Sequence, residues 1–290
     1  MGGPAELGAG DPFAELDPGA GDELAPVSLA AHLASRRGAL RSYTAFVLGA
    51  TGYVGRELVL ELRRAGHRTI AHIRPGSAQG ALAARFEAAG AEVDHTELTE
   101  PALAARLVAL APTHLFLCHG TTRRRGRAEG LADPYEAVDV GLTRLAVGAA
   151  RDLAEPPRVV YLSSMGAGGR GDYLAARGRA EALVRASGLP FTLCRAPLLT
   201  GPDRDEVRPG ERAAAALMRP ALRVLDALGL RRTASRYFPM DAREAAEGLV
   251  RSGFHHMTID RVVLADELRR VGVYERERWH PRSARDEGRH

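Results

Sequence analysis

The chain has 290 residues, of which 45% are hydrophobic and 26% charged, with a formal net charge of +4 at pH 7. This composition is ordinary for a globular protein, and the length allows one large domain or two small ones. No apolar run approaches the roughly 18 residues of a membrane span, and the N-terminus lacks the basic and apolar regions of a secretory signal. We therefore expect a cytoplasmic protein without a membrane-spanning segment.

The two cysteines, Cys118 and Cys194, both lie in apolar runs and are predicted to be buried thiols rather than a disulfide. No cluster of Cys and His has the spacing of a zinc site, so no metal is expected. Lysine is absent, and the densest basic run is Arg123–Arg127. We interpret this run as a solvated loop, or as a contact for a phosphate-bearing substrate or partner. Since no aromatic residues interleave it, nucleic-acid binding is not expected.

In chain order, residues 1–25 are rich in Gly, Pro, Ala and acidic residues, and residues 1–40 are expected to form a disordered or partly helical extension. Within it, Ser28 is predicted to cap a short helix over 29–37. A folded domain is expected over 41–274, with a substrate cover over about 196–274. Residues 275–290 are expected to form a charged tail.

From residue 44, short apolar runs alternate with segments of helical period. Strands are expected over 44–49, 68–73, 91–95, 114–119, 158–163 and 190–195. Helices are expected over 54–65, 78–89, 101–110, 132–154 and 173–187. Alternating strands and helices imply parallel strands with right-handed crossovers, so the predicted fold is α/β, a doubly wound parallel sheet of the Rossmann type.

After residue 196 the pattern loosens. A helix is expected over 212–228, and Asp241 is expected to cap a helix over 242–251. A last strand is expected over 254–259, followed by a helix through residue 270. Because ligands bind beyond the carboxyl ends of strands in such sheets, this C-terminal part is the expected substrate cover.

A glycine motif, GATGYVG over residues 49–55, joins the first strand to the first helix. Gly49 permits a tight turn, Gly52 lets the backbone approach a pyrophosphate, and Gly55 lets helix and strand pack closely. The start of the helix offers unpaired N–H groups to the phosphates. We expect the motif to bind a dinucleotide through Gly49, Thr51, Gly52, Tyr53, Val54 and Gly55.

The ends of later strands refine this prediction. An acidic residue after the second strand is typical of NAD sites, but here Arg74 follows it and is suited to a ribose phosphate. The sequence therefore favours NADP over NAD. Glu97 and Leu98 are expected at the adenine. His119, at the end of the fourth expected strand, and Gly120 are expected to line the nicotinamide side.

Further motifs carry a family resemblance. GATGYVG, Arg74-Pro75, SSMGA at 163–167 and YLAARGRAE at 173–181 resemble an atypical short-chain dehydrogenase/reductase, in the Tat-interacting-protein-like or NmrA-like branch. The resemblance covers roughly residues 43 to 270. The stretch from Arg195 to Pro202 is similar to the family's Arg-Pro-Gly-x-Leu-x-Gly-Pro pattern but departs from it at residues 196 and 197.

The resemblance implies an NADP(H)-dependent oxidoreductase with Tyr173 as proton donor or acceptor. Arg177 stands where the family has lysine, and either Ser163 or Ser164 is expected to hold the substrate oxygen. Since ammonium suits the family's ribose contact, Arg177→Lys is expected to preserve or raise activity. Asp139 is interpreted as supporting this network or as facing solvent.

Three functions remain open from the sequence. The first is hydride transfer between the nicotinamide and a small carbonyl or alcohol. The second is a cofactor-binding regulator without turnover, suggested by arginine at position 177. The third is a nucleotide-sugar epimerase or dehydratase, which the short glycine-rich stretch between Ser164 and Tyr173 disfavours. A small-molecule substrate is expected, and the oligomeric state is left open.

Overall fold

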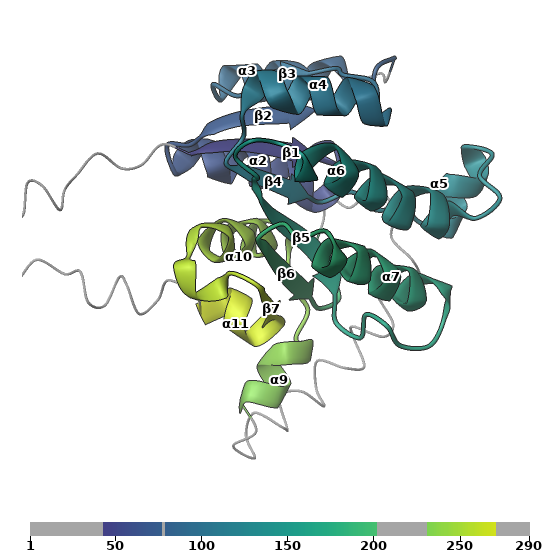
Figure 1. Ribbon diagram of the computed structural model, residues 1–290. Coiled ribbons are helices and arrows are strands. Elements are labelled where there is room, and N and C mark those ends of the chain that lie inside the picture. The colour runs from purple at the N-terminus through teal and green to yellow at the C-terminus, as the bar shows by residue number, and fades with distance from the viewer. Residues whose placement is uncertain (1–42, 77–78, 202–230, 271–290) are drawn as a thin grey trace, which may run out of the picture. The chain divides into compact units, whose positions relative to one another are not determined.

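The computed structural model describes residues 43–76, 79–201 and 231–270, which form a seven-stranded parallel sheet with helices on both faces. The strands run in the order β3-β2-β1-β4-β5-β6-β7, from top to bottom in Figure 1. Their bounds are Thr44–Leu48 (β1), Arg68–His72 (β2), Glu92–Asp94 (β3), His114–Leu117 (β4), Arg158–Ser164 (β5), Phe191–Ala196 (β6) and Arg261–Leu264 (β7). The predicted doubly wound α/β fold is confirmed. The expectations for residues 1–40, 212–228 and 275–290 lie outside the described residues.

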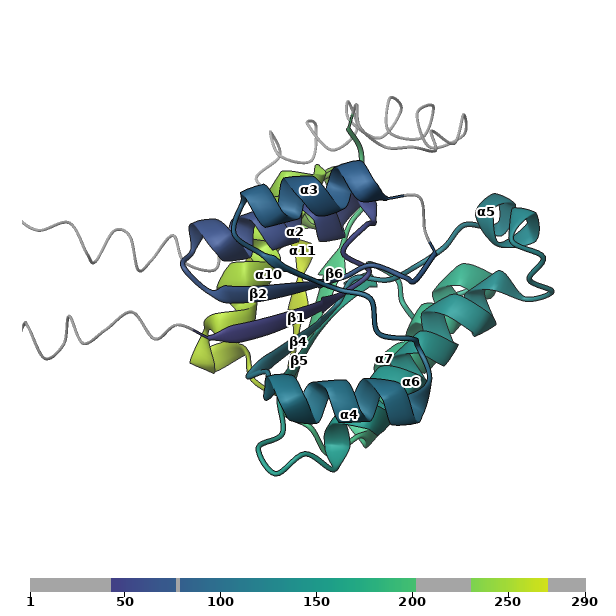
Figure 2. The same ribbon diagram turned by 90° about the horizontal axis from the view of Figure 1, so that it is seen from above.

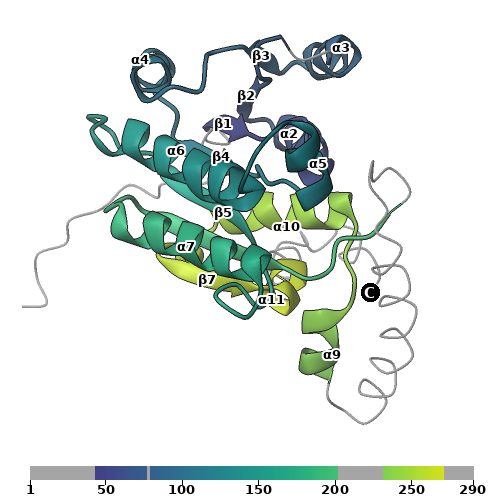
Figure 3. The same cartoon turned by 90° about the vertical axis from the view of Figure 1, so that its right-hand side faces the viewer.

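Two layers of helices cover the sheet, as Figures 2 and 3 show from two directions. One face carries α2 (Tyr53–Arg64), α3 (Gly80–Ala88), α10 (Ala242–Phe254) and α11 (Ala265–Arg270). The other carries α4 (Glu100–Leu110), α6 (Gly141–Arg151) and α7 (Asp172–Ala186). A further helix, α9, spans Arg231–Tyr237.

The first strand shows why the central strands read as continuous apolar runs. Ala45 and Val47 pack in the core beneath α2 and α10, while Phe46 and Leu48 pack in the core beneath α4, α6 and α7. Successive side chains of a strand point to opposite faces, so a strand covered on both sides must be apolar throughout. Each large side chain buried in this way stabilises the fold by about 1.5–3 kcal/mol.

Three local expectations are wrong in detail. The basic run is not a loop but a helix, α5 (Arg123–Ala128), in which Thr122 Oγ1 accepts a hydrogen bond from Arg125 N. The single helix expected over 132–154 is a π-helical turn, η1 (Tyr135–Val140), followed by α6. A π turn holds an extra residue, which helical periodicity in a sequence does not reveal.

The third difference concerns the last strand. The stretch 254–259 completes α10 and forms a short 3₁₀ turn, η2 (His256–Thr258), and the strand β7 begins only at Arg261. Arg158 fixes the turn by donating to the backbone oxygen of His255 and to Thr258 Oγ1. The predicted cap at Asp241 is confirmed, since its carboxylate accepts from Glu244 N at 2.7 Å.

The sheet topology determines where a ligand fits. β1 pairs with β2 on one side and β4 on the other, so the chain order reverses at β1. At such a point the connections from neighbouring strands run to opposite faces and leave a crevice at the carboxyl ends. In Figure 2, α5 lies beyond this end of the strands.

Candidate functional site

The glycine turn between β1 and α2 has the geometry that its three glycines predict. Gly49 has φ +86°, and a Cβ there would lie 2.4 Å from the backbone nitrogen of His119. A Cβ on Gly55 would lie 2.1 Å from Gly49 O, so helix and turn are in direct backbone contact. At Gly52 a Cβ would meet Gly49 O at 3.2 Å, a much milder contact. The first and third glycines are therefore required by the turn, while a side chain at Gly52 would need only a small shift of the Gly49 backbone.

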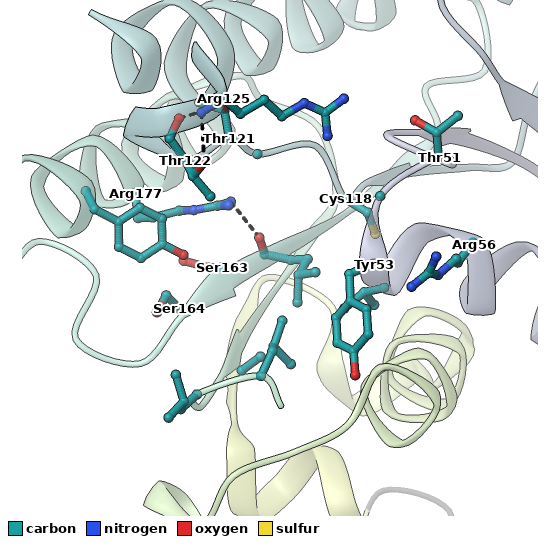
Figure 4. Close-up of a pocket in the computed structure, with 18 of the residues that line it drawn as sticks. Thr51, Tyr53, Arg56, Cys118, Thr121, Thr122, Arg125, Ser163, Ser164 and Arg177 are labelled. Carbon is teal, nitrogen blue, oxygen red and sulfur yellow. Dashed lines mark hydrogen bonds between the residues drawn. The ribbon is translucent and has the colours of Figure 1, made fainter. Parts of the chain in front are cut away.

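A cavity of about 820 Å³ opens at the carboxyl ends of β1, β4, β5 and β6 (Figure 4). In Figure 4, Ser163, Ser164 and Arg177 lie on one side of it, and Thr51, Tyr53 and Arg56 on the other. The predicted residues that line it are Thr51, Gly52, Tyr53, Val54, Gly120, Ser163, Ser164, Tyr173 and Arg177. The predicted catalytic residues and the glycine turn therefore share one cavity.

A second cavity, of about 100 Å³, lies beside the glycine turn. The predicted residues that line it are Gly49, Thr51, Gly52, Arg74, Leu98, His119 and Gly120. Two predicted contacts line neither cavity: Glu97 is exposed, and Gly55 is buried within the turn. Leu98 is thus brought to the site, whereas its neighbour Glu97 is not.

Helix α7 brings its functional side chains to the end of β5 by their spacing. Tyr173, Arg177 and Glu181 are four residues apart, so they lie along one face of the helix. The connecting loop folds back on α7, where a Cβ on Gly178 would lie 2.6 Å from the Cα of Gly168. Glycine at both positions therefore lets the loop pack directly against α7.

Arg177 is held by contacts to four different groups. Its Nε lies 3.0 Å from a carboxylate oxygen of Asp139, and its Nη1 donates to Tyr161 Oη and to Leu162 O, both at 2.9 Å. Its Nη2 lies 3.5 Å from His119 O. Burial opposes the charged form, but the phenols of Tyr161 and Tyr173 and the carboxylate of Asp139 hold the pKa of Arg177 well above its ordinary value, so the side chain is charged. A lysine has one ammonium group and cannot make all four contacts.

Asp139 is fully buried and therefore does not face solvent. Burial raises the pKa of its carboxyl, while the charge of Arg177 opposes that rise. The residue comes from the π-helical turn η1, which places it opposite α7. Tyr161 was not found from the sequence because it reads as one more apolar residue of β5.

The charge of Arg177 lies over the Tyr173 ring. Its Cζ is 5.4 Å from the ring centroid, a cation–π distance, while its hydrogen bond goes to the hydroxyl of Tyr161. Tyr173 also packs against Tyr135, with ring centroids 5.6 Å apart. The ring is thus held between a guanidinium and an aromatic neighbour at the wall of the large cavity.

The two serines at the end of β5 differ in their contacts. Ser163 is buried, and its Oγ donates to Glu181 Oε1 at 2.6 Å. Glu181 in turn pairs with Arg195 and Arg185, which lowers the pKa of its carboxyl against the effect of burial. Ser164 is less buried and makes a weak 3.3 Å contact with the backbone oxygen of Met165. Ser164 is therefore the serine whose hydroxyl is more available to a ligand.

His119 is buried at the end of β4 and lines the small cavity. Its Nε2 is 3.0 Å from Thr143 Oγ1, which itself donates to Asp139 O. Burial, together with the nearby charge of Arg177, lowers the pKa of His119 to about 3. The imidazole is therefore neutral near pH 7 and serves as a lining group rather than as a cation.

The sequence did not identify two charged residues at the small cavity. Arg125 from α5 and Glu129, the C-cap of that helix, line it together with Arg74. The basic run marked this segment, but nothing in the sequence indicates that it reaches Arg74 after β2. Cys118 lines both cavities, and burial raises the pKa of its thiol to about 12, which leaves it unreactive.

Within the described ranges, no three His, Cys, Asp or Glu residues gather as a metal site. Over those same ranges, every helix is too short or too polar to cross a bilayer. Both cysteines are buried and unpaired, as predicted.

Comparison with known families identifies the chain. The sequence profile of a family described as NAD(P)H-binding matches residues 49–218, more than half of the chain. The chain belongs to this NAD(P)H-binding family. No curated protein matches its sequence.

Solved structures of this NAD(P)H-binding protein's fold include several enzymes. UDP-glucose 4-epimerase from Brucella ovis, in complex with NAD, is 17% identical with a TM-score of 0.53, over 74% of each chain. UDP-glucuronic acid 4-epimerase from Bacillus cereus, in complex with UDP-glucuronic acid and NAD, is 13% identical with a TM-score of 0.54, over 76% of each chain. The terminal R domain of the myxalamid biosynthetic pathway is 17% identical with a TM-score of 0.55, over 77% of this chain and 66% of the other. At these identities the similarity establishes a common fold.

Proposed function

We propose that the protein is an NADP(H)-dependent oxidoreductase that transfers a hydride between the nicotinamide and a small carbonyl or alcohol. The observation that carries this proposal is that Tyr173, Arg177 and Ser164 line the same cavity as the glycine turn. Membership of the family establishes NAD(P)H binding, and we add the reaction. We also infer that the chain belongs to the Tat-interacting-protein-like branch that its motifs resemble.

The residues around the turn fit a dinucleotide. Helix α2 begins without a side-chain cap and without an acidic residue in its first turn, so its first N–H groups and positive dipole end suit a pyrophosphate. Gly52 lines both cavities and carries no side chain to block the approach. Leu98 offers an apolar surface for the adenine, and Gly120 and His119 are available on the nicotinamide side.

The bound nicotinamide supplies or accepts the hydride, and the protein handles the accompanying proton. We assign Tyr173 as the proton donor or acceptor, and Ser164 as the hydrogen-bond partner of the substrate oxygen. Arg177 keeps a positive charge over the Tyr173 ring and is itself fixed by Asp139 and Tyr161. In this assignment Arg177 is a positioning residue that holds the Tyr173 ring at the wall of the large cavity.

We propose NADP(H) rather than NAD(H) as the cofactor because Arg74 and Arg125 both reach the small cavity. A guanidinium hydrogen-bonded to a phosphate contributes about 1.5–3 kcal/mol. Arg74→Ala should therefore reduce the preference for NADPH over NADH by about tenfold or more, as measured by fluorescence titration. Equal affinity of the native protein for both cofactors would contradict the assignment.

The decisive experiment is NADPH oxidation with a panel of aldehydes, ketones and quinones, comparing the native protein with Tyr173→Phe. We expect turnover to be nearly eliminated while NADPH binding persists, because the hydroxyl acts on the proton rather than on the cofactor. Tyr135→Phe, a change in the ring packed against Tyr173, is the matched control and should retain turnover. Native turnover in Tyr173→Phe would disprove the catalytic assignment.

A cofactor-binding regulator without turnover is the second candidate. The observation in its favour is that Arg177 donates its hydrogen bond to Tyr161 rather than to Tyr173. It predicts NADPH binding without oxidation by any substrate of the panel. An epimerase, as in the structural neighbours, would instead convert a nucleotide sugar with no net change in nicotinamide absorbance.

A further inference from the structure

Two arginines converge on a single carboxylate oxygen at the small cavity. Arg74 Nη2 lies 3.3 Å and Arg125 Nε 3.2 Å from the same Oε1 of Glu129. Arg74 follows β2, whereas Arg125 lies in α5 and Glu129, four residues later, is the C-cap of that helix. Glu129 therefore links the end of β2 to the helix that follows β4, at a cavity also lined by Gly49 and Gly52.

The pair of guanidinium groups is suited to a phosphate as well as to a carboxylate. Both anions accept hydrogen bonds from guanidinium N–H groups, and a phosphate monoester carries more negative charge than a carboxylate. The two arginines lower the pKa of Glu129 against the effect of burial, so its carboxylate is ionised when it lies between them. An anion from a ligand must then compete with an anion that the chain itself provides.

We propose that Glu129 is an internal competitor for the 2′-phosphate of an NADP-type cofactor. In the absence of cofactor it pairs with Arg74 and Arg125, and the phosphate takes its place between them. This inference rests on the proposed use of NADP(H) at the glycine turn. It makes Glu129, together with Arg125, a determinant of how strongly the protein discriminates between phosphorylated and unphosphorylated cofactor.

The charge balance requires Glu129 to leave when a phosphate binds, and its position at the end of α5 allows it to leave. With Glu129 between the arginines, an added phosphate would leave excess negative charge, whereas without it two guanidinium groups neutralise the phosphate. Glu129 ends α5, its side chain is 33% exposed, and Gly130 follows with φ +76°. The carboxylate can therefore turn into solvent without unfolding the helix.

The test uses calorimetric titration of the full chain with adenosine 2′,5′-bisphosphate and adenosine 5′-monophosphate. Glu129→Gln removes the competing charge, so bisphosphate affinity should rise about threefold to tenfold, the range expected for two exposed ion pairs. Monophosphate affinity should change much less. Glu136→Gln is the matched control, because Glu136 also bridges two arginines, Arg144 and Arg179, but lines neither cavity. It should leave both affinities as in the native protein.

Unchanged bisphosphate binding by Glu129→Gln would overturn the inference, since Glu129 would then not compete with the phosphate. Weaker binding would also overturn it, since Glu129 would then hold the two arginines in position for the phosphate. If Arg74→Ala still abolishes the native preference for the bisphosphate, the proposed NADP preference survives that failure. If the native protein binds both nucleotides equally, the cofactor preference itself fails, and the inference fails with it. Dependence of turnover on Tyr173 is measured separately and does not enter this test.

Discussion

Arg177 and Asp139 form a buried ion pair beneath the candidate site, with Nε and a carboxylate oxygen 3.0 Å apart and side chains that are 8% and 0% exposed. The pair joins α7, which carries Tyr173, to the π-helical turn η1. A buried charge that loses its partner is strongly destabilising, because the remaining ion keeps its desolvation cost. Loss of this ion pair is therefore expected both to destabilise the fold and to loosen the packing of α7 against η1.

Asp139→Asn should lower the free energy of unfolding by about 3 kcal/mol, because Arg177 would be left buried without a counter-charge. Urea denaturation measures the change. The control is Asp152→Asn, which removes the carboxylate of an exposed pair with Arg151 and should have little effect. Equal stability of the two variants would show that Arg177 does not depend on Asp139.

Arg177→Lys should lower both stability and turnover, contrary to the expectation from the family's usual lysine. The ammonium group cannot replace the contacts with Asp139, Tyr161 and the backbone oxygen of Leu162 together. We expect a loss of about 1–3 kcal/mol in the free energy of unfolding, as for a buried polar group left without a partner. Higher activity in Arg177→Lys at unchanged stability would restore the expectation from the sequence.

The glycines of the turn should separate cofactor binding from folding. Gly52→Val should abolish NADPH binding, because Gly52 lines both cavities, and should leave a folded protein, because the 3.2 Å contact of its Cβ with Gly49 O is far milder than the overlaps at Gly49 and Gly55. Gly55→Ala should destabilise the protein by about 1–3 kcal/mol or more, because its Cβ would overlap the backbone oxygen of Gly49. Circular dichroism and NADPH titration distinguish the two. Native NADPH affinity in a folded Gly52→Val variant would refute the site.

The two serines should have opposite signatures. Ser163→Ala removes a buried hydrogen bond to Glu181 and should cost about 1 kcal/mol of stability. Ser164→Ala should leave stability nearly unchanged and, once a substrate is known, reduce turnover by up to about 100-fold, as for other donors to a reacting oxygen. The reverse pattern in thermal unfolding and steady-state kinetics would exchange the roles of the two residues.

Acid should destabilise the protein through its buried histidines. Burial lowers the pKa of His114 from 6.5 to about 3, so between these values the unfolded chain binds a proton that the folded chain does not. The free energy of unfolding should therefore fall as the pH drops below about 6.5, by at most about 1.4 kcal/mol per pH unit for each such histidine. His119, with its pKa also lowered to about 3, contributes in the same direction.

Chemical denaturation between pH 7 and pH 5.5 measures this slope, and the window lies above the range in which most carboxylates titrate. His114→Gln should make the slope shallower. His256→Gln, at an exposed position, controls for the general loss of a histidine. An identical slope in native protein and His114→Gln would show that His114 is not the source.

The order of the helices and strands and the glycine turn could be predicted from the sequence, because both depend on residues that are neighbours along the chain. The apolar runs of β1, β4 and β5 and the glycines at 49, 52 and 55 have local meaning, and a parallel sheet follows from their alternation. The spacing of Tyr173 and Arg177 likewise predicted a shared helix face. Shorter features, such as the π turn at Asp139 and the late start of β7, depend on packing that periodicity does not encode.

The pairing of charged groups depends on tertiary contacts, and the sequence could not predict it. Arg74 and Glu129 are far apart in sequence and come together because α5 lies beyond the carboxyl ends of the strands, where the segment after β2 also lies. Arg177 binds Tyr161 rather than Tyr173 because both Tyr161 and the backbone of β5 lie within reach of its guanidinium. In a chain where every strong base is arginine, residue type cannot identify the functional cations, and the partner supplied by the fold does so.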